Sequence, residues 1–139
     1  MPWLVIVAIV LSFVASTALG QDVRTVVNAA VPDNAVSKNT IRAIFGVRVR
    51  KWSDGSPITV FVLPDNDPLH ERFSKSQLNI FPHQLRRAWD RQVYSGTGQA
   101  PTEVANEEEM VRQLSETPGS IGYLSEDRVV PELKTLEIE

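Results

Sequence analysis

The pattern of apolar and polar positions divides the chain into an uncharged beginning and a longer part where short apolar runs alternate with helical patterns. The strongest strand is predicted at 58–63, because this run is nearly all apolar and rich in β-branched residues. Such a run is typical of a strand buried on both faces of a parallel sheet. Further strands are predicted at 23–31, 121–124 and 133–138, where apolar runs end at turn-forming residues.

Helices are predicted between these strands by capping residues that stand before helical apolar patterns. Ser37, Asp67 and Asn106 each have a side chain that can accept a hydrogen bond from the first turn of a helix. Pro82 is placed to open a further helix as its first residue. Gly46 is predicted to end the first helix as the residue just beyond its last turn.

The resulting order is β-α-β-α-α-α-β-β. Strands that are separated by helices favour right-handed crossovers and a parallel arrangement. The sequence therefore predicts one α/β domain, with a mainly parallel sheet of three to five strands and helices on both faces.

The first twenty residues carry no charged side chain and are mostly apolar. The apolar run is shorter than the about 20 residues that span a bilayer, and Ala18 and Gly20 suit the small-residue positions of a signal-peptidase site. Residues 1–20 are thus interpreted as a signal peptide and 21–139 as the mature domain, which predicts an exported, periplasmic protein. The alternatives are a cut after Ala18 and an uncleaved N-terminal anchor, the latter because no Lys or Arg precedes the apolar run.

Composition excludes several function classes. The formal net charge is −3, from 14 Lys and Arg against 17 Asp and Glu, which argues against a nucleic-acid partner recognised through net basicity. Without cysteine the chain can form no disulfide, zinc finger or iron–sulfur cluster. With only His70 and His83, no metal site is expected, and no cofactor is predicted.

Enzymatic motifs are not found either. The chain has no Gly-x-Ser-x-Gly elbow and no Walker-type phosphate loop. His70 and His83 are interpreted as surface or partly buried histidines. The run Glu107 to Glu109 is interpreted as the solvated first turn of a helix, because adjacent helical residues point in different directions. Because no nucleophile–base set or metal set is found, the sequence does not predict an enzyme.

Two segments are candidate binding sites. The turn 64–69 follows the best predicted strand and leads into a helix, a place where backbone N–H groups can hold an anion. The alternative is that Asp67 simply caps its own helix. Separately, basic side chains gather just before Trp52, and they form either an anion or partner site or a solvated face: Arg42, Arg48, Arg50 and Lys51.

Several of these segments resemble the phosphate-binding proteins of ABC transporters. The resemblance rests on a hinge strand leading into an Ile-Arg-Ala-Ile-Phe-Gly helix at 41–46, the tryptophan turn 52–58 and the strand motif Pro-Gly-Ser-Ile-Gly-Tyr at 118–123. It covers most of 26–124. It implies a periplasmic-binding-protein lobe lying between the two hinge crossings, whereas a complete family member has two lobes and is more than twice this long.

The resemblance also implies where a ligand would bind. The family's anion loop, which contains Arg, Asp, Ser, Gly and Thr, corresponds to 63–69, where only Asp65 matches. An aspartate, Asp67, stands where the family has serine, and Pro68 lacks the N–H that a phosphate could use. If a ligand binds, the candidate residues are Asp65, Asn66 and Asp67.

The resemblance implies an exported solute-binding module with phosphate or another oxyanion as ligand. The alternative function is a non-transport scaffold or protein-interaction subunit, which would meet a protein partner or a second copy of itself. In either case, the membrane would be contacted only through an uncleaved signal peptide.

Overall fold

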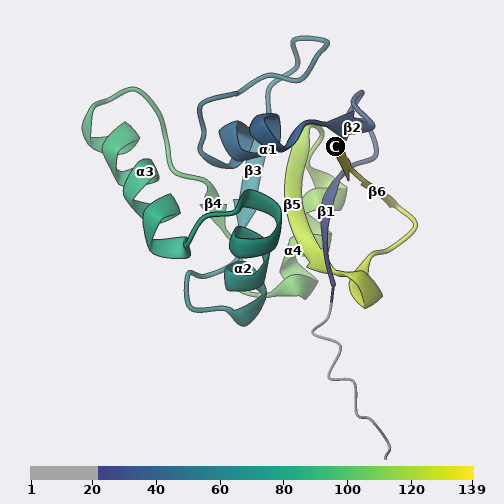
Figure 1. Ribbon diagram of the computed structural model, residues 1–139. Coiled ribbons are helices and arrows are strands. Elements are labelled where there is room, and N and C mark those ends of the chain that lie inside the picture. The colour runs from purple at the N-terminus through teal and green to yellow at the C-terminus, as the bar shows by residue number, and fades with distance from the viewer. Residues whose placement is uncertain (1–21) are drawn as a thin grey trace, which may run out of the picture.

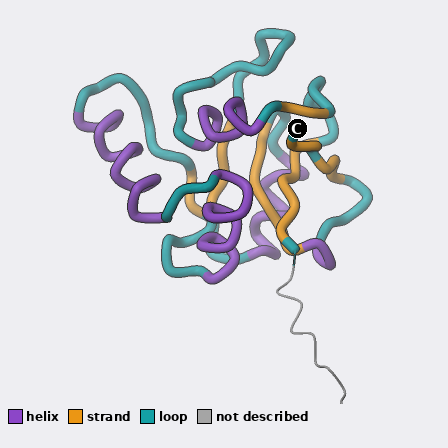
Figure 2. Tube along the Cα trace, in the orientation of Figure 1, coloured by secondary structure: helices purple, strands orange, loops and turns teal. Residues whose placement is uncertain are grey.

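The computed structural model describes residues 22–139, and the predicted signal peptide 1–20 lies outside this range. A five-stranded sheet forms the centre of the protein (Figures 1 and 2). Its order is β4-β3-β5-β1-β6, from strands Thr102–Glu103, Thr59–Val62, Ser120–Ser125, Val23–Asn28 and Leu133–Thr135. The α/β class and the predicted number of strands are confirmed.

The direction of the strands is mixed. β3 pairs parallel with β4 and with β5, whereas β1 pairs antiparallel with both β5 and β6. Four strands therefore run one way and β1 runs against them. The mainly parallel sheet is confirmed, with its parallel part around β3.

Helices cover both faces of the sheet, as predicted. Helices α1 (Lys38–Phe45) and α2 (Pro68–Phe73) lie in front of the sheet in Figure 1, and α4 (Glu107–Glu116) lies behind it. A π-helical turn, η1 (Ser74–Leu78), follows α2, and α3 (Pro82–Tyr94) lies beyond it to the side of the sheet. A short 3₁₀ turn, η2 (Glu126–Arg128), follows β5, and a separate two-stranded parallel sheet joins β2 (Ala35–Val36) to β7 (Glu137–Ile138).

The predicted caps explain where the helices begin. Ser37 accepts a hydrogen bond from the backbone N–H of the residue three positions later at 3.1 Å, and Asn106 does the same at 2.9 Å. Pro82 opens α3 as expected. The prediction for Gly46 is off by one residue: Gly46 keeps a helical φ of −77°, and Val47 takes the left-handed conformation at φ 58°.

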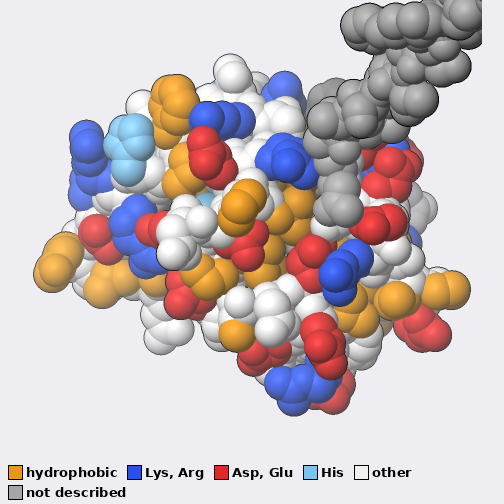
Figure 3. Space-filling model, turned by 90° about the horizontal axis from the view of Figure 1, so that it is seen from below, with side chains coloured by type: hydrophobic (Ala, Val, Ile, Leu, Met, Phe, Trp, Pro, Cys, Tyr) orange, Lys and Arg blue, Asp and Glu red, His pale blue; other side chains and the backbone are white. Residues whose placement is uncertain are grey.

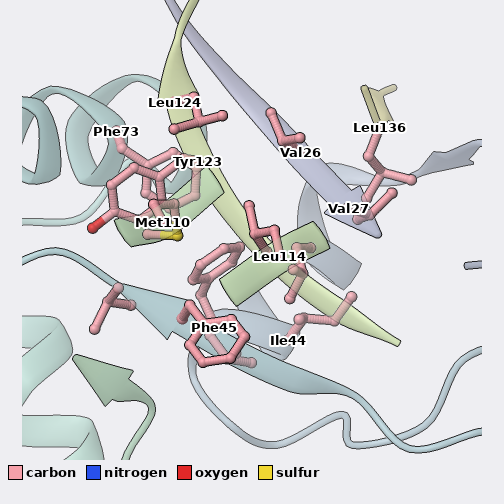
Figure 4. Close-up of a cluster of buried hydrophobic side chains, with 14 of the residues drawn as sticks. Val26, Val27, Ile44, Phe45, Phe73, Met110, Leu114, Tyr123, Leu124 and Leu136 are labelled. Carbon is pink, nitrogen blue, oxygen red and sulfur yellow. The ribbon is translucent and has the colours of Figure 1, made fainter. Parts of the chain in front are cut away.

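The core on the front of the sheet is aromatic. The ring of Phe73 stacks on Tyr123 with centroids 4.0 Å apart, and Phe45 meets Phe73 edge-on at 4.7 Å (Figure 4). On the opposite face of β5, Gly122 lies beneath α4. A Cβ at position 122 would fall 2.6 Å from the sulfur of Met110, so the helix rests directly on the strand backbone.

Candidate functional site

The predicted ligand residues lie in the turn between β3 and α2, at the carboxyl end of the sheet's central parallel strand. Asp67 caps α2, because its Oδ1 accepts a hydrogen bond from the N–H of Leu69 at 2.8 Å. Asn66 is exposed at the tip of the turn. The structure therefore places the three residues in one turn but gives each a different environment.

The carboxylate of Asp65 is held by an arginine from α3. Arg86 donates to both carboxylate oxygens, from Nε to Oδ2 and from Nη2 to Oδ1, each at 2.9 Å. This hydrogen bonding holds the pKa of the Asp65 carboxyl below its ordinary value and raises the pKa of Arg86. Arg86 also lies over the ring of Trp89, 4.9 Å from its centroid. The cation nearest the turn is thus already paired with the chain's own anion.

A buried hydrogen-bond network lies directly beneath this ion pair. The hydroxyl of Tyr123 accepts a hydrogen bond from the N–H of Leu63 at 2.9 Å and also contacts Nδ1 of His70. Since both side chains are fully buried, the hydroxyl hydrogen has His70 as its acceptor. His70 therefore carries its own proton on Nε2.

The second nitrogen of His70 faces the ion pair. Nε2 lies 3.9 Å from Oδ1 of Asp65, which is too long for a hydrogen bond, and it has no hydrogen-bond partner within residues 22–139. Burial lowers the pKa of His70, so the ring is neutral at physiological pH. The expectation of a surface or partly buried histidine was wrong for His70, and it was wrong because no local pattern reveals a hydrogen bond to a residue 53 positions away.

Sequence reasoning missed both Arg86 and Tyr123 as members of this site. Arg86 binds a carboxylate that lies 21 positions earlier in the chain. The missed signal is the buried tyrosine in a strand beside the turn, because a buried hydroxyl needs a hydrogen-bond partner.

Chemically, this site offers fixed and already satisfied polar groups. The turn carries the carboxylates of Asp65 and Asp67, and the guanidinium of Arg86 is already bound to both oxygens of Asp65. An entering oxyanion would therefore meet negative charge. No group of three or more His, Asp or Glu side chains within residues 22–139 is placed to hold a metal ion. The arrangement joins β3, β5, α2 and α3 at one point.

Comparison with known proteins identifies the family of the chain. A family model described as the PBP superfamily domain matches residues 13–136. The chain belongs to this PBP superfamily. Among curated proteins, no sequence matches it.

Solved structures share the fold. One is a putative phosphate ABC transporter substrate-binding protein with bound phosphate from Clostridium perfringens, with a TM-score of 0.68 at 12% identity. The match covers 84% of this chain and 44% of the Clostridium perfringens chain. An ABC-type phosphate transport receptor from Vibrio cholerae has a TM-score of 0.65 at 14% identity, with 84% and 45% covered. The PstS structure from Borrelia burgdorferi has a TM-score of 0.65 at 15% identity, with 84% and 47% covered.

These matches confirm the resemblance to phosphate transporter binding proteins. This PBP-superfamily chain spans less than half of the length of each of the three solved structures. At identities of 12–15% the comparison establishes the fold, and the ligand has to be argued from this chain's own residues.

Proposed function

We propose that this protein is an exported lobe of the PBP superfamily that binds a protein partner and neither transports nor transforms a solute. The observation that carries the proposal is the ion pair between Asp65 and Arg86. It occupies the turn where the resemblance places the family's anion loop. Residues 63–69 contain no Lys or Arg, and the guanidinium of Arg86 that reaches this turn is already bound to Asp65.

The magnitude of the charge effect supports this proposal. A phosphate dianion about 4 Å from a carboxylate is opposed by several kcal/mol at an effective dielectric constant of about 20. To bind there, phosphate would have to displace Asp65 from a bidentate pair with Arg86, while Asp67 remained as a second carboxylate in the turn.

The surface of α3 supports binding of a protein. Its apolar side chains are only partly covered, because Leu85 and Trp89 are buried whereas Phe81 and Val93 are 51% and 48% exposed. Tyr94, at the end of the helix, is 89% exposed. Exposed aromatic side chains of this kind are enriched in protein interfaces. The face seen from below shows apolar side chains scattered among acidic and basic ones (Figure 3).

Export is part of the proposal and rests on the uncharged apolar beginning of the chain and its small-residue cleavage positions. No helix within residues 22–139 is both long and apolar enough to cross a membrane. Expression of the full chain in a bacterial host, followed by N-terminal sequencing of the periplasmic fraction, would test export. A mature N-terminus at Gln21 is expected, and a full-length protein retained with the membrane would contradict it.

Isothermal titration of residues 21–139 with inorganic phosphate tests the loss of ligand binding. We expect no saturable heat at millimolar phosphate. The Arg86→Ala variant serves as the matched control, because it removes the one guanidinium at the turn. Saturable heat in the unaltered chain that disappears in this variant would refute the proposal.

The second candidate function is oxyanion binding at Asp65, Asn66 and Asp67. It is favoured by the Clostridium perfringens structure, whose description includes bound phosphate. The same titration separates the two functions, because only oxyanion binding produces saturable heat.

A further inference from the structure

We propose that an arginine-lined pocket between α1 and α3 binds an acidic segment of a partner protein through its carboxylates and an apolar side chain. This inference rests on the proposed function, since it names the partner's chemistry. The pocket has a volume of about 850 Å³ and lies apart from the turn after β3.

Positive charge collects around this pocket without any opposing charge. Arg42 comes from α1, Arg48 and Arg50 from the loop that follows it, and Arg91 from α3. No acidic side chain lines the pocket. The sequence singled out the first three as a basic cluster, and the fold adds the fourth from a helix more than forty positions later. Lys51, the other member of that cluster, does not line the pocket.

These arginines differ from most arginines elsewhere in residues 22–139, although Arg87 on α3 is likewise exposed and forms no ion pair there. Within residues 22–139, the guanidinium groups of Arg42, Arg48 and Arg91 form no ion pair and donate no hydrogen bond, and all three residues are exposed. Arg50 donates to the backbone oxygens of Val47 and Thr97, so it ties the two helix ends together while its charge stays uncompensated. In contrast, other arginines of the same chain pair with carboxylates: Arg24, Arg86, Arg112 and Arg128.

The floor of the pocket is apolar. It combines buried leucines with partly buried small and branched side chains from α1, η1, α3 and the loops after α1 and η1: Ala43, Val47, Leu78, Ile80, Leu85 and Ala88. An apolar centre surrounded by polar side chains, with arginine enriched among them, is typical of protein–protein interfaces. Arginine forms bidentate hydrogen bonds with carboxylates, which suits it to recognise acidic side chains on such a rim.

The same geometry favours a protein segment over a free inorganic ion. The guanidinium groups stand on exposed side chains around a half-open hollow, whereas a small ion needs donors that converge on one point. In addition, α1 and α3 both end beside the pocket, so their carbonyl ends oppose a small anion at its centre. An extended acidic segment can keep its carboxylates on the rim and place an apolar side chain on the floor.

The test uses residues 21–139 and a fluorescein-labelled 12-residue peptide of glutamates with two central leucines, followed by fluorescence anisotropy at 0.15 M salt. Peptides with lysine in place of glutamate, or serine in place of leucine, are the controls. We expect the first peptide to bind and both controls to bind at least about tenfold more weakly, because each removes one of the two recognised features.

Variants locate the binding surface. Arg42→Gln and Arg91→Gln should each weaken binding about tenfold, which is the scale of one lost charge-assisted hydrogen bond. Arg87→Gln makes the same change of charge on α3 at a residue outside the pocket, and it should leave binding within about twofold. Unchanged thermal unfolding of all three would show that the fold is intact.

Several outcomes would overturn the proposal. The first is that the acidic peptide does not bind at millimolar concentration. The second is that Arg87→Gln weakens peptide binding as much as Arg42→Gln and Arg91→Gln do. The third is that phosphate at the same concentration as the peptide displaces it. Self-association in light scattering that is lost in Arg42→Gln would assign the pocket to a second copy of the chain and would also overturn it. These results are separate from a failure of the proposed function, which would appear as phosphate heat that depends on Arg86.

Discussion

The hydroxyl group of Tyr123 is expected to be a main stabilising feature of the region beneath the turn. The substitution Tyr123→Phe removes one oxygen atom and keeps the ring that stacks on Phe73. It leaves two buried polar groups without their partner, the N–H of Leu63 and Nδ1 of His70. The aromatic packing stays in place, so the effect isolates the hydrogen bonds.

The magnitude follows from the number of groups left unpaired. Each buried polar group that loses its hydrogen bond costs about 1–3 kcal/mol. Two such groups predict a loss of roughly 2–6 kcal/mol, a large part of the 5–15 kcal/mol by which domains are typically stable. The variant should therefore fold but unfold at a clearly lower urea concentration.

Urea unfolding followed by tryptophan fluorescence and circular dichroism measures this loss. Tyr94→Phe is the matched control, because the Tyr94 side chain is 89% exposed and its hydroxyl makes no hydrogen bond within the described part of the chain. The control should change the free energy of unfolding by less than about 0.5 kcal/mol. A loss below about 1 kcal/mol for Tyr123→Phe would refute the network, as would equal losses in the two variants.

Three further predictions concern other parts of the fold. Burial lowers the pKa of His70 in the folded protein, whereas the same side chain in the unfolded protein takes up a proton near pH 6.5. The free energy of unfolding should therefore fall as the pH drops below about 6.5. In His70→Gln, the urea midpoint of unfolding should depend less steeply on pH. Gly119→Ala should destabilise by roughly 2–5 kcal/mol, because φ is 77° and the new Cβ would lie 2.5 Å from a backbone oxygen. Gly55→Ala, at φ 85° with open space around it, should cost only about 1–2 kcal/mol, and equal losses would contradict the steric argument. Asn106→Ala should cost about 1 kcal/mol in thermal or urea unfolding by removing the cap of α4, while Asn106→Asp should retain it; a loss that is the same in both would exclude the cap as the cause.

Local patterns predicted the elements that depend on neighbouring residues. The central strand was visible as an unbroken apolar run, and the caps at Ser37, Asp67 and Asn106 lie where short polar side chains precede helical patterns. The antiparallel direction of β1 was not predicted, because direction depends on connections across the whole sheet. β4 was missed since it has only two residues, both exposed and polar.

The candidate site was predicted less well, for the same physical reason. The turn and the capping role of Asp67 follow from residues within a few positions of one another. The pairing of Asp65 with Arg86 and of His70 with Tyr123 joins positions 21 and 53 apart, and no local signal indicates such contacts. The end of α1 was misplaced by one residue, because the left-handed conformation falls on Val47, and β-branched residues rarely adopt it.

The close approach of α4 to β5 at Gly122 limits how this part of the sequence can vary. Met110 already lies where a Cβ on the strand would have to go. A larger residue at position 122 is therefore compatible with the fold only if position 110 becomes smaller at the same time. We expect homologous sequences to change these two positions in a correlated way, or to keep both.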